Sequence, residues 1–209
     1  MSLEKAYDYI VIGAGSAGCV MASRLSENLT DRVLLLEAGN RDSNPWIHVP
    51  IGYFKTMHNP KTDWCYMTEP DPGINGRQLQ WPRGKVLGGS SSLNGLLYVR
   101  GQKEDYDDWA ALGNQGWSYD EVLPYFKKSE DQERGANKYH GVGGPLSVSN
   151  IRIRREICDR FIDAAEQIGI PRNDDSNGET QEGVGYFQLT INRNGTRCST
   201  AVGFLRPAL

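Results

Sequence analysis

The stretch that decides the fold is residues 8–37, DYIVIGAGSAGCVMASRLSENLTDRVLLLE. It begins with a β-branched and aromatic run, Asp8–Ile12, which is typical of a strand. A glycine-rich turn at Gly13–Gly18 then opens a segment that reads as a helix to about Glu27. A second continuous apolar run, Val33–Leu36, is typical of a strand buried in a parallel sheet. The stretch therefore predicts a strand, a helix and a second, parallel strand, with both strands buried.

Three glycines in this stretch have the spacing of a dinucleotide-binding turn. Gly13 allows the tight turn, Gly15 leaves room for a pyrophosphate, and Gly18 lets the helix pack on the strand. At the helix N-terminus, free backbone N–H groups and the helix dipole favour phosphate oxygens. We therefore expect the phosphates of a dinucleotide to bind at Gly13, Gly15, Ser16, Ala17 and Gly18.

Glu37 stands at the end of the second strand, 19 residues beyond Gly18. Its carboxylate is placed to accept hydrogen bonds from a ribose diol and would repel a 2′-phosphate, which argues against NADP. The glycine fingerprint serves NAD and FAD alike, so it leaves the choice between them open. The alternative is that this stretch binds no dinucleotide and is a plain strand-to-helix turn with an exposed Glu37.

The 209 residues carry a formal charge of −3, with 23 basic and 26 acidic residues interspersed along the chain. Because no basic run is longer than Arg154-Arg155 beside Arg152, the sequence offers no electrostatic footprint for nucleic acid. The length suits one large or two small globular units, and the 24 glycines predict many turns.

Cysteine and histidine spacing predicts no metal site, because the chain has no CxxC pair and no two histidines at i, i+4. Reduced thiols favour a cytoplasmic protein. The apolar run at Tyr9–Ile12 is interrupted by Gly13 and Gly15 and is too short for a signal peptide or a membrane span. We therefore expect no targeting or transmembrane segment.

Regular periodicity disappears between Asn40 and Arg83, a stretch that contains six prolines. Such a long loop within a compact domain is usually functional or covers a site. Its three tryptophans, Trp46, Trp64 and Trp81, either roof an active site or simply pack the loop. The sequence does not choose between these two interpretations.

The second half of the chain alternates helical and strand patterns. Helices are predicted at 104–112, at 122–126 after the capping box of Ser118 and Glu121, and at 157–168. A short strand is expected at Leu146–Val148, and alternation over 186–191 predicts a half-buried antiparallel strand. A turn at residues 194–195 and a further helix near Ser199 follow.

A second glycine-rich run spans residues 84–101, GKVLGGSSSLNGLLYVRG. Gly88 and Gly89 permit backbone contact with a flat ring. The hydroxyls of Ser90 to Ser92 can serve phosphate or ring heteroatoms, and Asn94 offers both a donor and an acceptor. The run resembles the first signature of the glucose-methanol-choline (GMC) oxidoreductases, and the pattern continues through residue 107. Further stretches similar to this family are 37–39, 140–146 and 197–208.

The resemblance implies an α/β fold (α+β overall), with a Rossmann-like FAD-binding domain and the start of a substrate domain built on an antiparallel sheet. It implies the FAD-binding domain at 1–145, with the dinucleotide unit at 7–39 and the flavin-contacting signature at 84–107. Residues 146–192 would start the substrate-binding domain, and 193–209 would return to the FAD domain, where the chain is truncated. The implied cofactor-binding residues are Gly13, Gly15, Ser16, Ala17, Gly18, Glu37, Ala38, Gly88, Gly89, Ser90, Ser92, Asn94, Gly95 and Leu96, the last three beside the isoalloxazine.

The activity implied by the resemblance is FAD-dependent oxidation of the CH–OH group of a small-molecule alcohol, by hydride transfer to flavin N5. The similarity is greatest to bacterial choline-dehydrogenase-like and alcohol dehydrogenase branches of the family. The family's catalytic base lies near the C-terminus of a longer chain, so we assign no catalytic residue here and expect this N-terminal part alone to be inactive. The alternatives are a GMC-fold fatty-acid photodecarboxylase and a non-catalytic nucleotide-binding fragment. The sequence does not identify the electron acceptor.

The mode of flavin attachment also follows from the resemblance. Some GMC members bind FAD covalently through a His immediately before the Asn of the signature. Leu93 occupies that position here and has no nucleophilic atom. We therefore expect FAD to be bound non-covalently.

Overall fold

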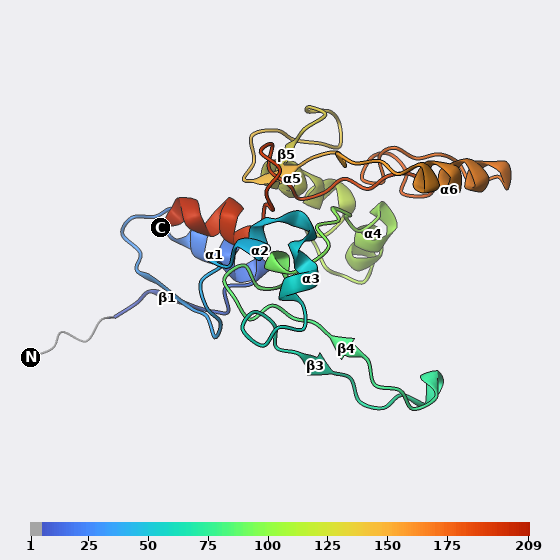
Figure 1. The fold of residues 1–209 in the computed structure, drawn as a ribbon. Coiled ribbons are helices and arrows are strands. Elements are labelled where there is room, and N and C mark those ends of the chain that lie inside the picture. Colours follow the sequence, from blue (N-terminus) through green and yellow to red (C-terminus); the bar gives the residue numbers. More distant parts are fainter. Residues whose placement is uncertain (1–5) are drawn as a thin grey trace, which may run out of the picture. The chain divides into compact units, whose positions relative to one another are not determined.

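A computed structural model describes residues 6–209 of the chain (Figure 1). The chain forms two compact units, one of Met1–Leu96 with Asn194–Leu209 and the other of Leu97–Arg193. The first boundary between these units falls after Leu96, well before the expected functional boundary between residues 145 and 146. The chain returns to the first unit at Asn194, one residue after the expected return at 193. The assignment of FAD-binding and substrate-binding domains stays a prediction.

The first unit begins with the expected strand, helix and parallel strand. Strand β1 (Tyr9–Ile12) pairs in parallel with β2 (Val33–Leu36), and helix α1 (Ser16–Leu25) connects them. The register runs from Tyr9 opposite Val33 to Ile12 opposite Leu36. The prediction of this unit is confirmed, although the helix ends slightly before Glu27.

The expectation that both strands are buried is wrong for this chain. Ile10 is 59% exposed and Ile12 is 84% exposed. Within residues 6–209, no third strand joins the sheet of β1 and β2. Strands of a parallel sheet are buried only when neighbouring strands and helices cover them.

The stretch between residues 40 and 83 contains short elements rather than one irregular loop. They are α2 (Pro45–His48), α3 (Tyr53–Thr56) and the antiparallel pair β3 (Tyr66–Met67) and β4 (Gln80–Trp81), with short 3-10 helices at Pro50–Gly52 and Pro72–Ile74. Local side-chain bonds hold these elements. The Asn44 side chain accepts from the Trp46 N–H and caps α2. The Asp63 carboxylate accepts from the backbone N–H groups of His58, Cys65 and Arg83.

The C-terminal segment returns to the first unit as the helix expected near Ser199. It is a π-helix, Ala201–Leu205, followed by a 3-10 turn, Arg206–Ala208. This helix packs beside α1, as the red and blue coils show (Figure 1). Ala22 of α1 and Phe204 of the π-helix are both buried, so this contact forms part of the unit's core.

The second unit contains three helices and a two-stranded parallel pair. The helices are α4 (Lys103–Ala111), α5 (Tyr119–Ser129) and α6 (Glu156–Gln167), and β5 (Glu130–Gln132) pairs with β6 (Leu146–Val148). The predicted capping box is present at the start of α5, where Glu121 accepts hydrogen bonds from Ser118. Among the described residues, no helix is both long and apolar enough to cross a membrane.

The strand predicted over 186–191 is wrong. The stretch contains isolated bridges rather than a continuous strand, and Leu189 bridges antiparallel to Leu97 and to Ser149. Burial also departs from the expected alternation, since Phe187 is 45% exposed and Gln188 only 5%. The buried Gln188 amide exchanges hydrogen bonds with the Gln132 amide, at 2.9 and 2.7 Å. A polar side chain with such hydrogen-bond partners can be buried. The alternation of apolar and polar residues does not predict this, because it assigns polar side chains to the exposed face.

A buried ionic cluster joins distant parts of the second unit. Glu130 Oε1 lies 2.7 Å from Arg100 Nη2 and 3.0 Å from His140 Nδ1. His140 Nε2 in turn lies 2.9 Å from Asp175 Oδ2. Burial by itself would lower the pKa of His140, but its hydrogen bonds with Asp175 and Glu130 raise that pKa to about 9. Burial would raise the pKa of Glu130, but the His140 hydrogen bond and the Arg100 charge lower it.

These pKa shifts predict how the stability of the protein depends on pH. Because the folded pKa of His140 is raised from 6.5 to about 9, its contribution is complete below about pH 6.5 and is lost as the pH rises through 9. Thermal unfolding between about pH 6 and pH 10 should show this loss, on the order of 1–3 kcal/mol. His140→Gln should remove the alkaline decline, whereas His58→Gln, at an exposed position, should retain it. An unchanged alkaline decline in His140→Gln would contradict this assignment.

Candidate cofactor-binding site

The first unit contains an open hollow of about 560 Å³ between its two glycine runs. Residues from β1, the first glycine turn, the end of β2 and the second glycine run line it, together with Trp64. Four of the nine lining residues are glycines, so much of the lining carries no side chain. The lining residues are Ile12, Gly13, Gly15, Leu36, Glu37, Ala38, Trp64, Gly84 and Gly89.

The first glycine turn has the geometry that a phosphate cradle needs. Gly13 has a φ of +91°, which favours glycine. A side chain at Gly18 would overlap the Gly13 carbonyl, whereas one at Gly15 would meet nothing within 4 Å. No side chain caps the N-terminus of α1 at Gly15, so the first N–H groups of the helix are available to an anion.

The two glycine runs meet backbone to backbone. The Gly88 N–H donates to the Ala14 carbonyl at 2.7 Å. Gly89 has a φ of +54°, and a Cβ there would lie 2.7 Å from the Gly15 Cα. Gly89 is therefore required for packing of the protein itself, while the open side of Gly15 leaves space for a ligand.

Glu37 joins the end of β2 to the first glycine turn. Its Oε2 accepts from the Ala14 N–H at 2.8 Å, and its Oε1 accepts from the Gly39 N–H at 2.7 Å. Each carboxylate oxygen can accept a further bond, so this side chain is held in position and keeps acceptor capacity toward the hollow. Its contact with a ribose stays a prediction.

Trp64 is a wall residue whose role the sequence left open. Its ring lies parallel to that of Tyr66, with the centroids 5.8 Å apart and 4° between the planes. Lys85 Nζ lies 4.5 Å from the Trp64 ring centroid. Trp64 is 41% exposed and belongs to the lining of the hollow. An aromatic side chain in the lining suits a ligand with a flat ring.

Hydrogen bonds from the C-terminal segment hold the second glycine run in place. The Ser91 hydroxyl lies 2.9 Å from the Thr200 hydroxyl and accepts from the Thr200 N–H at 3.0 Å. Arg197 Nη1 donates to the Ser91 carbonyl at 3.1 Å and to Asn94 Oδ1 at 2.8 Å. A contact more than 100 residues apart in sequence thus shapes this run, and only the fold reveals it.

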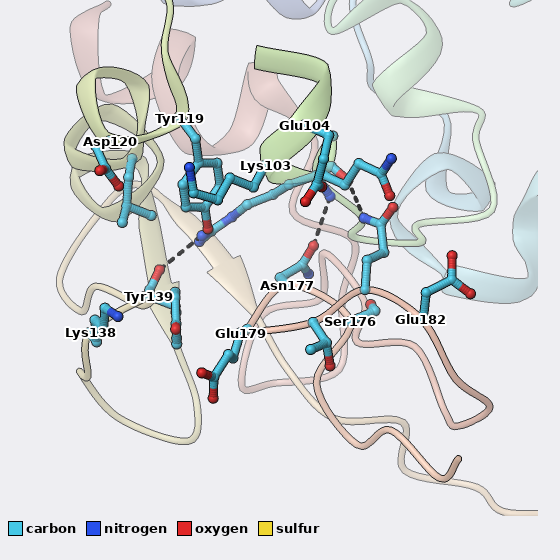
Figure 2. Close-up of a pocket in the computed structure, with 17 residues that line it drawn as sticks. Lys103, Glu104, Tyr119, Asp120, Lys138, Tyr139, Ser176, Asn177, Glu179 and Glu182 are labelled. Atoms are coloured by element: carbon cyan, nitrogen blue, oxygen red, sulfur yellow. Dashed lines mark hydrogen bonds between the residues drawn. The ribbon is translucent and has the colours of Figure 1, made fainter. Parts of the chain in front are cut away.

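The second unit has a separate hollow of about 510 Å³ around Arg100 (Figure 2). Its inner polar groups already bond to one another. The Asn177 side chain accepts from the Arg100 N–H at 2.7 Å, Gln181 donates to the Arg100 carbonyl at 2.8 Å, and Arg100 Nη1 donates to the Tyr139 carbonyl at 2.8 Å. Figure 2 shows acidic and basic side chains around it. This hollow has no glycine cradle, and in residues 6–209 no group of three or more His, Cys, Asp or Glu is arranged to hold a metal.

Comparison with known proteins decides the family. Residues 7–209 match the family model described as GMC oxidoreductase. The chain belongs to the GMC oxidoreductase family. Human mitochondrial choline dehydrogenase is 47% identical over 210 residues, which cover 97% of this chain and 35% of that protein. The alcohol dehydrogenase (acceptor) of Pseudomonas putida is 45% identical over 204 residues, which cover 97% and 37%.

Solved structures of GMC enzymes have the same fold. Pyridoxine 4-oxidase from Mesorbium loti aligns with a TM-score of 0.90 and 36% identity, covering 96% of this chain and 39% of that one. An FAD-dependent oxidoreductase from Chaetomium thermophilum aligns with a TM-score of 0.87 and 30% identity, covering 97% and 36%. The chain thus spans little more than a third of the length of these relatives. These neighbours confirm the α/β fold class.

The GMC signature residues occupy different environments in this chain. Ser92 is fully buried and its hydroxyl donates to the Leu87 carbonyl at 2.8 Å, whereas Ser90 is exposed and its hydroxyl accepts from the Gly84 N–H at 3.1 Å. Asn94 is exposed. Of the predicted residues, five line the hollow: Gly13, Gly15, Glu37, Ala38 and Gly89. The others lie outside its lining, and their contacts with a cofactor stay predictions: Ser16, Ala17, Gly18, Gly88, Ser90, Ser92, Asn94, Gly95 and Leu96.

Proposed function

We propose that this chain is the FAD-binding part of an oxidoreductase that oxidises the CH–OH group of an alcohol. The observation that carries the proposal is the meeting of the two glycine runs beside Glu37, around an uncapped helix N-terminus. When bound, FAD supplies the acceptor of a hydride at its N5 atom. The proposal does not depend on the hollow in the second unit.

The wall of the hollow fits a flavin dinucleotide in three respects. The open space at Gly15 admits a diphosphate close to the backbone, and the start of α1 presents N–H donors to it. Glu37 is held by the Ala14 and Gly39 N–H groups, so its free acceptor positions are oriented for a ribose diol. Trp64 places an aromatic side chain in the same lining. FAD is favoured over NAD because the family signature is that of flavoenzymes and a solved neighbour is described as FAD-dependent.

Names of the relatives support an alcohol as the substrate class. They include choline dehydrogenases and an alcohol dehydrogenase, and the reaction common to them is oxidation of a carbon that bears a hydroxyl group. We assign no particular alcohol to this chain. The signature contacts expected at Asn94, Gly95 and Leu96 would set the cofactor ring beside that substrate.

We predict that Gly15→Val abolishes flavin retention without unfolding the protein. The backbone of Gly15 has a φ of −77°, and a Cβ there meets nothing within 4 Å, so only the ligand is displaced. Flavin absorbance per chain and the thermal unfolding midpoint should be measured together. Met21→Val, at an exposed position of α1, is the matched control and should keep both. Gly15→Val protein that stays fully yellow would refute the diphosphate assignment.

We predict that denaturation releases all of the flavin. Leu93, which stands where some GMC members carry the linking His, has a purely hydrocarbon side chain and is 2% exposed. It can pack against its neighbours but cannot form a bond to FAD. After acid or heat treatment, all yellow colour should be found in the supernatant. A mass increment equal to FAD on the denatured polypeptide would show that another residue forms a covalent link.

We predict that the 209-residue chain alone turns over no alcohol. The family's catalytic base aligns with none of its three histidines, and loss of a general base typically costs about 10²–10⁴-fold in rate. His140, the buried member of the three, is bonded to Glu130 and Asp175 and serves the packing of the second unit. Reduction of an artificial acceptor should be followed with several primary alcohols. Alcohol-dependent reduction by this chain would show that its base is among the present residues.

A further inference from the structure

Arg197 is the largest fully buried side chain of the described structure, with 1% of its surface exposed. Its guanidinium donates from Nε to the Ile47 carbonyl at 2.8 Å, and from Nη1 to the Ser91 carbonyl and Asn94 Oδ1 at 3.1 and 2.8 Å. Burial lowers the pKa of Arg197 to about 10, so it is still protonated at neutral pH. Placing a cation here costs desolvation free energy that an apolar side chain would not.

The contact with Arg197 determines which way the Asn94 amide points. Asn94 Oδ1 accepts from Arg197 and also from the Leu96 N–H at 3.1 Å. Both neighbours are donors only, so the reverse amide orientation would place its NH2 group against two N–H donors. The amide oxygen therefore faces the protein. Among the described residues the NH2 group has no acceptor, and the Asn94 side chain is exposed.

The same two bonds hold an unusual turn. Leu96 is buried with a φ of +67°, a left-handed conformation that is costly for a residue with a Cβ. Such a conformation persists only where the surrounding structure over-determines it. The bond from the Leu96 N–H to Asn94 Oδ1 and the bond from Arg197 to the same oxygen provide that support.

We propose that Arg197 is a positioning residue that orients the Asn94 amide with its oxygen inward and its NH2 group outward, as a hydrogen-bond donor to the flavin. This inference rests on the proposed function, because it takes FAD as the ligand of the second glycine run. The guanidinium acts through Asn94 and does not itself need to touch the cofactor. A planar fork suits the task, since it reaches a carbonyl and the amide oxygen at once.

A double-mutant cycle on the flavin-loaded protein tests this inference. The variants are Arg197→Met, Asn94→Ala and the combination of both, with Arg206→Met as the matched control. Arg206 lies in the same C-terminal segment but pairs with Asp42 rather than with Asn94. The measurements are the dissociation constant of FAD, the visible spectrum of the bound flavin, its reduction potential, and the thermal midpoint of the flavin-free chain.

The expected result is that Arg197→Met and Asn94→Ala each raise the FAD dissociation constant about tenfold and alter the flavin spectrum in the same way. The double variant should resemble Asn94→Ala alone, because Arg197 acts through that side chain. Arg197→Lys should raise the FAD dissociation constant less than Arg197→Met does, since one ammonium can still donate to the amide oxygen. If Arg197→Met does not fold, Arg197→Lys replaces it in the cycle.

Three outcomes would overturn the inference. The first is a double variant in which the increases in the FAD dissociation constant caused by Arg197→Met and Asn94→Ala multiply. The second is Arg197 variants that lower the thermal midpoint while the dissociation constant, the spectrum and the potential stay unchanged. The third is a control Arg206→Met that shifts the flavin spectrum as Arg197→Met does. Wild-type protein that binds no flavin would instead overturn the proposed function itself, and the inference with it, so the two failures are distinguishable.

Discussion

The backbone of Gly89 lies against that of Gly15, and this close approach organises the first unit. A hydrogen bond from Gly88 to Ala14 holds the two runs together. A residue with a Cβ at position 89 would overlap the Gly15 backbone, so the contact requires glycine at position 89. Because the two runs meet in this way, the open side of Gly15, the Glu37 carboxylate and Trp64 come to line one hollow.

Buried polar groups decide how the second run is shaped. Its serines and its asparagine make bonds to the protein before any ligand is considered, and Arg197 satisfies acceptors from two separate segments. In the second unit, the buried Glu130 carboxylate pairs with Arg100 and His140. Each cluster is tolerated in the interior because its charged groups face hydrogen-bond partners, which offset the loss of hydration.

Many of these features could be predicted from short-range patterns. The strand, turn, helix and strand of residues 8–37 follow from side-chain periodicity and glycine placement, and the capping box at Ser118 follows from spacing. Burial was predicted less well. Ile12 is exposed although it is apolar, and Gln188 is buried although it is polar, because each depends on neighbours far away in the chain.

The sequence by itself determined the family, the parallel strand unit and the residues that are available to a dinucleotide, because these depend on contiguous residues and local backbone preferences. Only the tertiary structure decided which of them share a wall. It showed that Gly89 serves packing, that the Ser92 hydroxyl is turned inward, and that Arg197 holds Asn94 from 103 residues away. The physical reason is that hydrogen bonds and backbone contacts over such separations form only when the chain has folded, and no local pattern encodes the partner.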